Sequence, residues 1–96
     1  MTSPAFDVAH PYRLNPSVAL RPEPFGALAY HFGNRRLSFL KAPELVELVR
    51  ELGRHPSVGD ALAGVPDARR GAFLRALASL AAADMIIPQR SGTGAR

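Results

Sequence analysis

The chain has 96 residues, of which 47% are hydrophobic and 21% are charged, with a formal net charge of +4 and no cysteine. This length and composition predict one small globular domain rather than a disordered chain. The lack of cysteine excludes disulfides, cysteine-ligated zinc and iron–sulfur clusters. No apolar run approaches the ~20 residues of a membrane span, and the first residues do not read as a signal peptide, so we expect a cytoplasmic protein.

The first part of the chain predicts little regular structure. Residues 1–16 contain three prolines and few periodic apolar positions, so we expect a loose N-terminal arm. Residues 17–21, SVALR, alternate in polarity as a short strand does. Pro22 and Pro24 follow, and we expect them to end this strand because proline has no amide donor.

The segment FGALAYHFGNRRLSFL, residues 25–40, is typical of a β-hairpin. A two-residue loop at Gly33-Asn34 is indicated because both residues tolerate positive φ. It places Tyr30 opposite Leu37, and opposite side chains share a face of the sheet. The face that we expect to meet the core carries Leu28, Tyr30, Leu37 and Phe39. The other face, expected to be more exposed, carries Ala29, His31, Arg36 and Ser38.

Three helices are predicted after the hairpin, at residues 43–52, 57–64 and 67–83. Pro43 suits a first helical turn, Ser57 an N-cap and Gly53 a C-terminal cap. Residues 84–88 form a short apolar segment, and we expect a flexible tail at 89–96. The fold class is therefore α+β, with a three-stranded antiparallel sheet followed by three helices in a domain spanning residues 17–88.

The residue types that perform chemistry are scattered. The three histidines, His10, His31 and His55, have no second ligand at metal-binding spacing on their own elements. The glutamates of the first helix lie on one helical face and indicate a solvated surface rather than an acid–base pair. We therefore expect no catalytic residue, no metal site, no cofactor and no enzymatic activity.

Binding is the remaining class of function, and the residues leave alternatives open. Arginines at the hairpin tip and on the third helix are compatible with a DNA-binding winged helix, although the codon bias of a GC-rich genome explains them equally well. The strand at residues 36–40 has no proline and forms an edge of the expected sheet. Such an edge could accept an extended peptide, or be covered by the arm or by a second copy of the chain.

Two segments carry a resemblance to a known family: YRLNPSVALRPEPFGALAYHFGNRRLSFLKAPELVELVREL and FLRALASLAAADMI. Together they resemble the mycofactocin biosynthesis chaperones, which belong to the PqqD-like precursor-peptide (RiPP) recognition elements. The likeness covers about residues 12–88, and VALRPEPFGALAYHFGNRRLSFL is its most specific part. Two positions depart from the family pattern: Ala42 replaces a hydroxyl cap, and Asp84 stands where glycine often closes the third helix.

The resemblance implies a winged-helix-like fold and no catalysis. It implies that the protein binds the leader of a ribosomally made precursor peptide and delivers it to a radical S-adenosylmethionine maturase, without a membrane or nucleic acid as partner. The leader would add as a strand beside the third helix, and acidic leader residues could pair with nearby arginines. The residues implied in peptide binding are Arg36, Leu37, Ser38, Phe39 and Leu40 on the strand and Arg70, Phe73, Leu74 and Leu77 on the helix.

Overall fold

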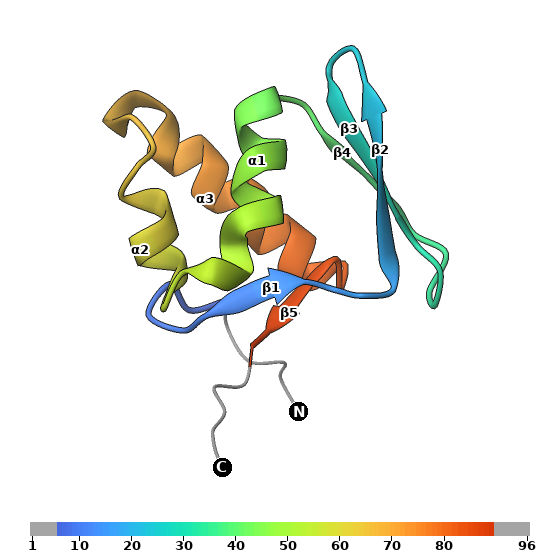
Figure 1. Cartoon of the computed structure of the whole chain (residues 1–96), viewed down its shortest axis with the longest axis horizontal. Coiled ribbons are helices and arrows are strands. Elements are labelled where there is room, and N and C mark those ends of the chain that lie inside the picture. Colours follow the sequence, from blue (N-terminus) through green and yellow to red (C-terminus); the bar gives the residue numbers. More distant parts are fainter. Residues whose placement is uncertain (1–5, 90–96) are drawn as a thin grey trace.

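The computed structural model describes residues 6–89 and has the expected α+β class (Figure 1). Three helices are grouped on one side of a three-stranded antiparallel sheet, and two further short strands pair with each other below the helices. In chain order the elements are β1 (Tyr12–Leu14), β2 (Val18–Glu23), β3 (Gly26–His31), β4 (Leu37–Leu40), α1 (Pro43–Glu51), the 3₁₀ turn η1 (Leu52–Arg54), α2 (Val58–Leu62), α3 (Asp67–Ala82) and β5 (Ile86–Pro88).

The register predicted for the hairpin is confirmed, with Tyr30 opposite Leu37 and Leu28 opposite Phe39. The expected end of β2 is wrong, because the strand continues through Pro22 to Glu23. The Phe32 amide donates to the Ser17 carbonyl at 2.8 Å. Because antiparallel pairs alternate, the backbone groups of Ala19 and Arg21 also face β3, whereas those of the residues between them point outward. Pro22 therefore lies at a position that faces the open side of an edge strand, where a missing amide costs little.

The two faces of the hairpin are the reverse of those predicted, although Arg36 is exposed as expected. Ala27, Ala29 and His31 are buried, whereas Leu37 is 58% exposed and Phe39 is 61% exposed. Cross-strand pairing fixes which side chains share a face, but it does not decide which face meets the helices. Here α1 packs against β3, and the short alanine side chains leave room for this close approach.

The loop of the hairpin also differs from the expected two-residue turn. Five residues, 32–36, lie between β3 and β4, and the left-handed conformation falls on Arg35 (φ 62°), whose amide donates to the His31 carbonyl at 2.8 Å. The Nδ1 atom of His31 accepts hydrogen bonds from the amides of Gly33 and Asn34, at 2.9 and 3.1 Å. These bonds stabilise the loop although neither Gly33 nor Asn34 has a positive φ. The loop conformation therefore depends on the buried His31 ring and not on the turn preference of Gly33-Asn34.

The expectation of a loose N-terminal arm is wrong for residues 12–14. These residues form β1, which pairs antiparallel with β5 from the end of the domain. The arm is held because Tyr12 and Ile86, one from each strand, are both buried in the core. Residues 1–5 of the expected arm and residues 90–96 of the expected tail lie outside the described residues.

The three predicted helices are present, but α2 ends at Leu62 rather than at Gly64. Ser57 caps α2 by accepting a hydrogen bond from the Asp60 amide at 3.0 Å, as its position predicts. Gly53 does not cap α1, because the chain continues as η1. Asp84 adopts φ 65° directly after α3, in the left-handed geometry that aspartate tolerates.

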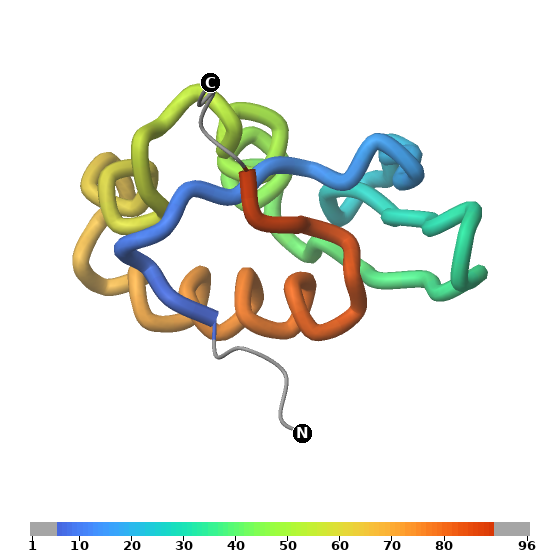
Figure 2. Tube along the Cα trace, turned by 90° about the horizontal axis from the view of Figure 1, so that it is seen from below, coloured from blue at the N-terminus to red at the C-terminus, as the bar shows by residue number. Residues whose placement is uncertain are grey.

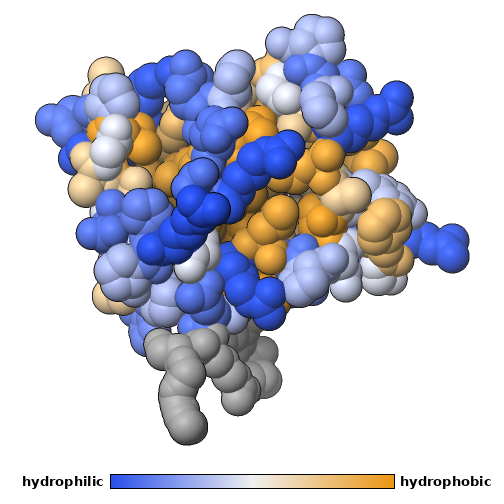
Figure 3. Space-filling model, in the orientation of Figure 1, coloured by the Kyte–Doolittle hydropathy of each residue, from blue (hydrophilic) through white to orange (hydrophobic). Residues whose placement is uncertain are grey.

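The core lies between the inner face of the sheet and the helices, and in the view of Figure 3 hydrophobic residues gather toward the middle of the molecule with hydrophilic residues around them. Its largest fully buried side chains are Leu40, Leu52, Leu77, Met85, Ile86, Val49 and Val58. In Figure 2 the strands lie in the order β2, β3 and β4, and β4 is the strand on the side of α3. No helix within residues 6–89 is long and apolar enough to cross a membrane.

Candidate functional site

The outer edge of β4 is open to an added strand. The His31 amide donates to the Arg36 carbonyl at 3.0 Å, so Arg36 faces β3. Because the pairs of an antiparallel ladder alternate, Ser38 and Leu40 also face β3, whereas the backbone groups of Leu37 and Phe39 point away from it. Within residues 6–89 no backbone group pairs with this outward side. A proline at Ser38 would consequently test the fold rather than binding.

The other edge of the sheet is less suited to pairing. The residues of β2 that face outward are Val18, Leu20 and Pro22, as the same alternation requires. The Val18 amide donates to the Asn15 carbonyl at 2.9 Å, and Pro22 has no amide hydrogen. Only Leu20 offers a donor there, so β4 is the edge on which an extended peptide can form a continuous ladder.

A groove of about 320 Å³ lies beside the open edge, between β4 and α3. Ser38 and Phe39 line it on the strand side, and Ala76 and Ser79 line it on the α3 side. Leu45 and Leu80 complete the lining. The short side chains of Ala76 and Ser79 keep the helix surface low at this point, which leaves space for the side chains of a bound segment.

Contacts at the hairpin tip hold β4 and α3 at a fixed spacing. The Asn34 side-chain amide donates to the Ala83 carbonyl at the end of α3, at 3.2 Å. Since Nδ1 of His31 accepts hydrogen bonds from the loop, its Nε2 carries the proton and lies 3.1 Å from a carboxylate oxygen of Asp84. One end of the groove is therefore braced by three polar side chains.

Positive charges stand at both ends of β4. Arg35 and Arg36 precede the strand and Lys41 follows it, and all three residues are exposed. Within the described part of the chain, none of them forms an ion pair. They are free to attract acidic groups, each exposed pair contributing about 0–1 kcal/mol.

Several residues that the resemblance placed in the site are parts of the core. Leu40 and Leu77 are fully buried, and Phe73 is buried as well. The side chains of Leu40 and Leu77 support the strand and the helix from beneath, and Phe73 lines a different pocket between α1, α2 and α3. The part of the predicted set that is accessible along the open edge of β4 consists of Arg36, Leu37, Ser38 and Phe39.

Arg70 holds the loop between α2 and α3. Its Nε donates to the Leu62 carbonyl at 3.1 Å, and one terminal nitrogen donates to the Val65 carbonyl at 2.8 Å. The other lies 2.8 Å from a carboxylate oxygen of Asp67. These bonds direct the guanidinium away from the groove. Because Arg69 also pairs with Glu44, at 3.3 Å, two of the three α3 arginines are engaged within the chain, which weakens the DNA-binding alternative.

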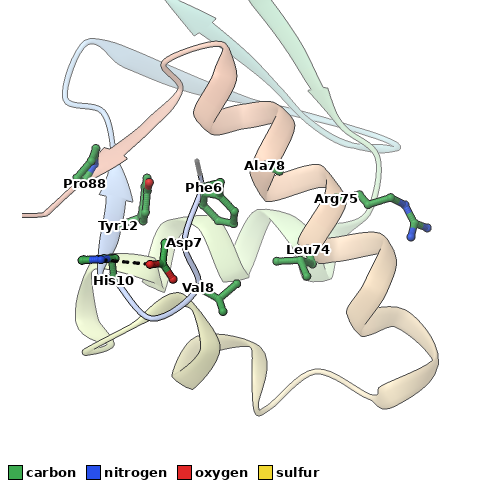
Figure 4. A pocket seen from close by; sticks show the side chains of 9 residues that line it. All are labelled: Phe6, Asp7, Val8, His10, Tyr12, Leu74, Arg75, Ala78 and Pro88. Carbon is green, nitrogen blue, oxygen red and sulfur yellow. Dashed lines mark ion pairs between the residues drawn. The ribbon is translucent and has the colours of Figure 1, made fainter. Parts of the chain in front are cut away.

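Leu74 lies on the other flank of α3, in a larger cleft of about 780 Å³ (Figure 4). This cleft is closed on its opposite side by the N-terminal segment, including Phe6 and Val8, and by Tyr12 of β1. Asp7 and His10 form an ion pair of 3.3 Å at its edge. Leu74 therefore belongs to a different surface from the β4 groove.

Ala76 and Ser79, which sequence reasoning missed, lie one step around α3 from the predicted face. They line the groove together with Leu80, and positions three and four apart are neighbours on a helix surface. A row of small residues beside a predicted edge strand could have indicated them. The apolar pattern favoured Phe73 and Leu77 instead, because large apolar side chains mark the core face.

The described residues also contain no group of three or more His, Asp or Glu side chains that could hold a metal ion. The most buried histidine, His31, is committed to the loop and to Asp84. What the site offers is a pairing edge, a narrow groove and flanking positive charge.

Comparison with known proteins agrees with a peptide-binding surface. The sequence profile of the Peptide chaperone MftB family matches residues 11–87. The chain belongs to this family. It is 49% identical over 89 residues to Peptide chaperone MftB of Mycobacterium ulcerans (strain Agy99), covering 91% of this chain and 82% of that protein.

A second relative, Peptide chaperone MftB of Mycobacterium tuberculosis (strain ATCC 25618 / H37Rv), is 45% identical over 91 residues, covering 93% of this chain and 84% of that protein. The family resemblance seen in the sequence is thereby confirmed. No solved structure gives a significant match.

Proposed function

We propose that the protein is a non-catalytic chaperone that holds the leader of a ribosomally made precursor peptide as a fourth strand beside β4. It then presents the peptide to a radical S-adenosylmethionine maturase, which carries out the chemistry. The observation that carries the proposal is the outward backbone of Leu37 and Phe39 beside the α3 surface at Ala76 and Ser79. Membership of a family of peptide chaperones supports it.

The two parts of the site would contribute differently to binding. Pairing with the backbone of Leu37 and Phe39 supplies affinity with little dependence on the peptide sequence. The groove of about 320 Å³ between β4 and α3 supplies selection, because its small and apolar lining meets the side chains of the bound segment. A chaperone of this kind binds one short segment of the peptide tightly and leaves the rest of the peptide accessible to the maturase.

The proposal assigns no bond-making step to this chain. Incubation of the purified protein with S-adenosylmethionine and precursor peptide is expected to give no modified peptide, because the described residues contain no metal-binding cluster. Mass spectrometry of the peptide checks this. Steady product formation without the maturase would contradict a purely binding role.

Replacement of Leu37 by proline is expected to weaken leader binding by about 1–3 kcal/mol, because a hydrogen-bonding group of the peptide loses its partner. The fold should survive, since Leu37 is exposed and its amide points away from β3. Titration of the precursor peptide, followed through backbone amide shifts, measures the effect.

Leu37→Ala is the matched control, because it shortens the same side chain and keeps the amide. The difference in affinity between the two variants isolates the backbone hydrogen bond. In the wild-type protein the bound peptide should protect the amides of Leu37 and Phe39 from hydrogen exchange. Protection confined to other segments would show that the peptide binds elsewhere.

A further inference from the structure

The most exposed large hydrophobic side chains gather on the outer face of the hairpin sheet. Phe32 is 62% exposed, close to the values for Leu37 and Phe39, and Phe25 is 42% exposed. Phe25 packs edge-on against Phe39 at 5.8 Å between ring centroids, and Tyr30 packs in the same way against Phe32 at 5.1 Å. Four aromatic rings are thus packed in two pairs on a surface that no described element covers.

This face meets the open edge of β4. A strand added to β4 has two faces of its own, and its residues opposite Leu37 and Phe39 would share the outer face with them. Its intervening residues would share the face of Ser38, which lines the groove. Both faces of the added strand therefore lie beside apolar or small side chains of the chaperone, and apolar residues on either face would gain packing contacts that polar residues would not make.

The inference rests on the proposed function and concerns the kind of segment that is bound. We propose that the recognised segment is a run of consecutive apolar residues with acidic residues at its ends. Alternate side chains of the run pack outside on Leu37 and Phe39 and inside the groove on Ala76 and Ser79. The acidic ends lie near Arg36 and Lys41.

The same charges argue against a second copy of the chain on this edge. Two β4 strands paired antiparallel would bring the Arg35–Arg36 end of one against the Lys41 end of the other. Like charges placed across neighbouring strands are destabilising. The acidic ends of a bound peptide would instead be attracted by Arg36 and Lys41. Charge complementarity therefore favours the peptide over a second copy of the chain.

Phe39→Thr provides the test, with Phe32→Thr as its matched control. Both rings are equally exposed on the outer face, but only Phe39 lies on the pairing strand. Threonine keeps strand propensity, so both variants should fold. The probes are synthetic peptides with leucine–valine runs and acidic ends, and two variants of them in which serine replaces every second apolar residue, at odd or at even positions.

Phe39→Thr is expected to lower the affinity for the uninterrupted peptide about two- to fivefold, as lost cross-strand apolar contacts do. Phe32→Thr should leave it unchanged. The peptide whose serines face outward should bind both the wild type and Phe39→Thr with the same reduced affinity, because the partner of Phe39 is already missing. Lysines in place of the acidic ends should weaken binding further.

Two results would overturn the inference while leaving the proposed function intact. One is unchanged affinity in Phe39→Thr, although the peptide still protects the Leu37 amide from exchange. The other is a dimer in sedimentation equilibrium that both threonine variants dissociate, which would assign the outer face to a second copy. Loss of amide protection at Leu37 in the wild type would instead overturn the proposed function itself.

Discussion

Replacing Leu40 by alanine is expected to lower the free energy of unfolding by about 2–5 kcal/mol. Leu40 has no exposed surface and is among the largest fully buried side chains, although it lies on the edge strand. Its truncation would leave a cavity beside the helices, and packed cores relax only partly around such a cavity. Urea denaturation followed by circular dichroism measures the loss.

Phe39→Ala is the matched control, one position earlier on the same strand. Its ring is 61% exposed and touches Phe25 at the surface, so the expected loss is below about 1 kcal/mol. The pattern of the hairpin alone predicts the opposite order, with Phe39 in the core. A larger loss for Phe39→Ala than for Leu40→Ala would show that the sheet turns its aromatic face inward.

The register of the hairpin could be read from the sequence because it depends on local pairing. Tyr30 with Leu37 and Leu28 with Phe39 are apolar pairs, and a shift by one residue would break both. The orientation of the sheet could not be read in this way. It depends on how closely α1 approaches β3, where Ala27 and Ala29 are small enough to be covered completely.

The features that the sequence concealed are those made by distant residues. The loop depends on the ring of His31, and its position depends on contacts of Asn34 and His31 with the end of α3. β1 exists only because β5, which follows all three helices, lies beside it. Three-residue strands of this kind have no periodic pattern long enough to reveal them.

The candidate site was half predictable for the same reason. The pairing strand is recognisable because β4 has no proline, whereas β2 has Pro22 at an outward position. The helix side required knowledge of the packing. Apolar periodicity identifies Phe73 and Leu77, which are buried, while the groove is lined by the less conspicuous Ala76 and Ser79.

Gly26→Ala is expected to destabilise the protein by about 3 kcal/mol or more, through strain and steric overlap together. Gly26 has φ 148°, a conformation that residues with a side chain rarely adopt. A Cβ atom there would lie 2.1 Å from the Leu40 carbonyl oxygen and 3.0 Å from the Ala42 nitrogen. Both are backbone atoms at the junction of β4 and α1, so relief requires this junction to move.

Gly64→Ala is the control for this prediction, because a Cβ atom at Gly64 would have no neighbour within 4 Å and its φ is not positive. It should change stability by less than about 1 kcal/mol, with a small gain from a less flexible unfolded chain. Since Gly26 lies beside Leu40, any folded Gly26→Ala protein should also bind the precursor peptide more weakly, whereas Gly64→Ala should bind normally. Equal denaturation midpoints for the two variants would refute the close approach of Gly26 to the strand on which the peptide is proposed to pair.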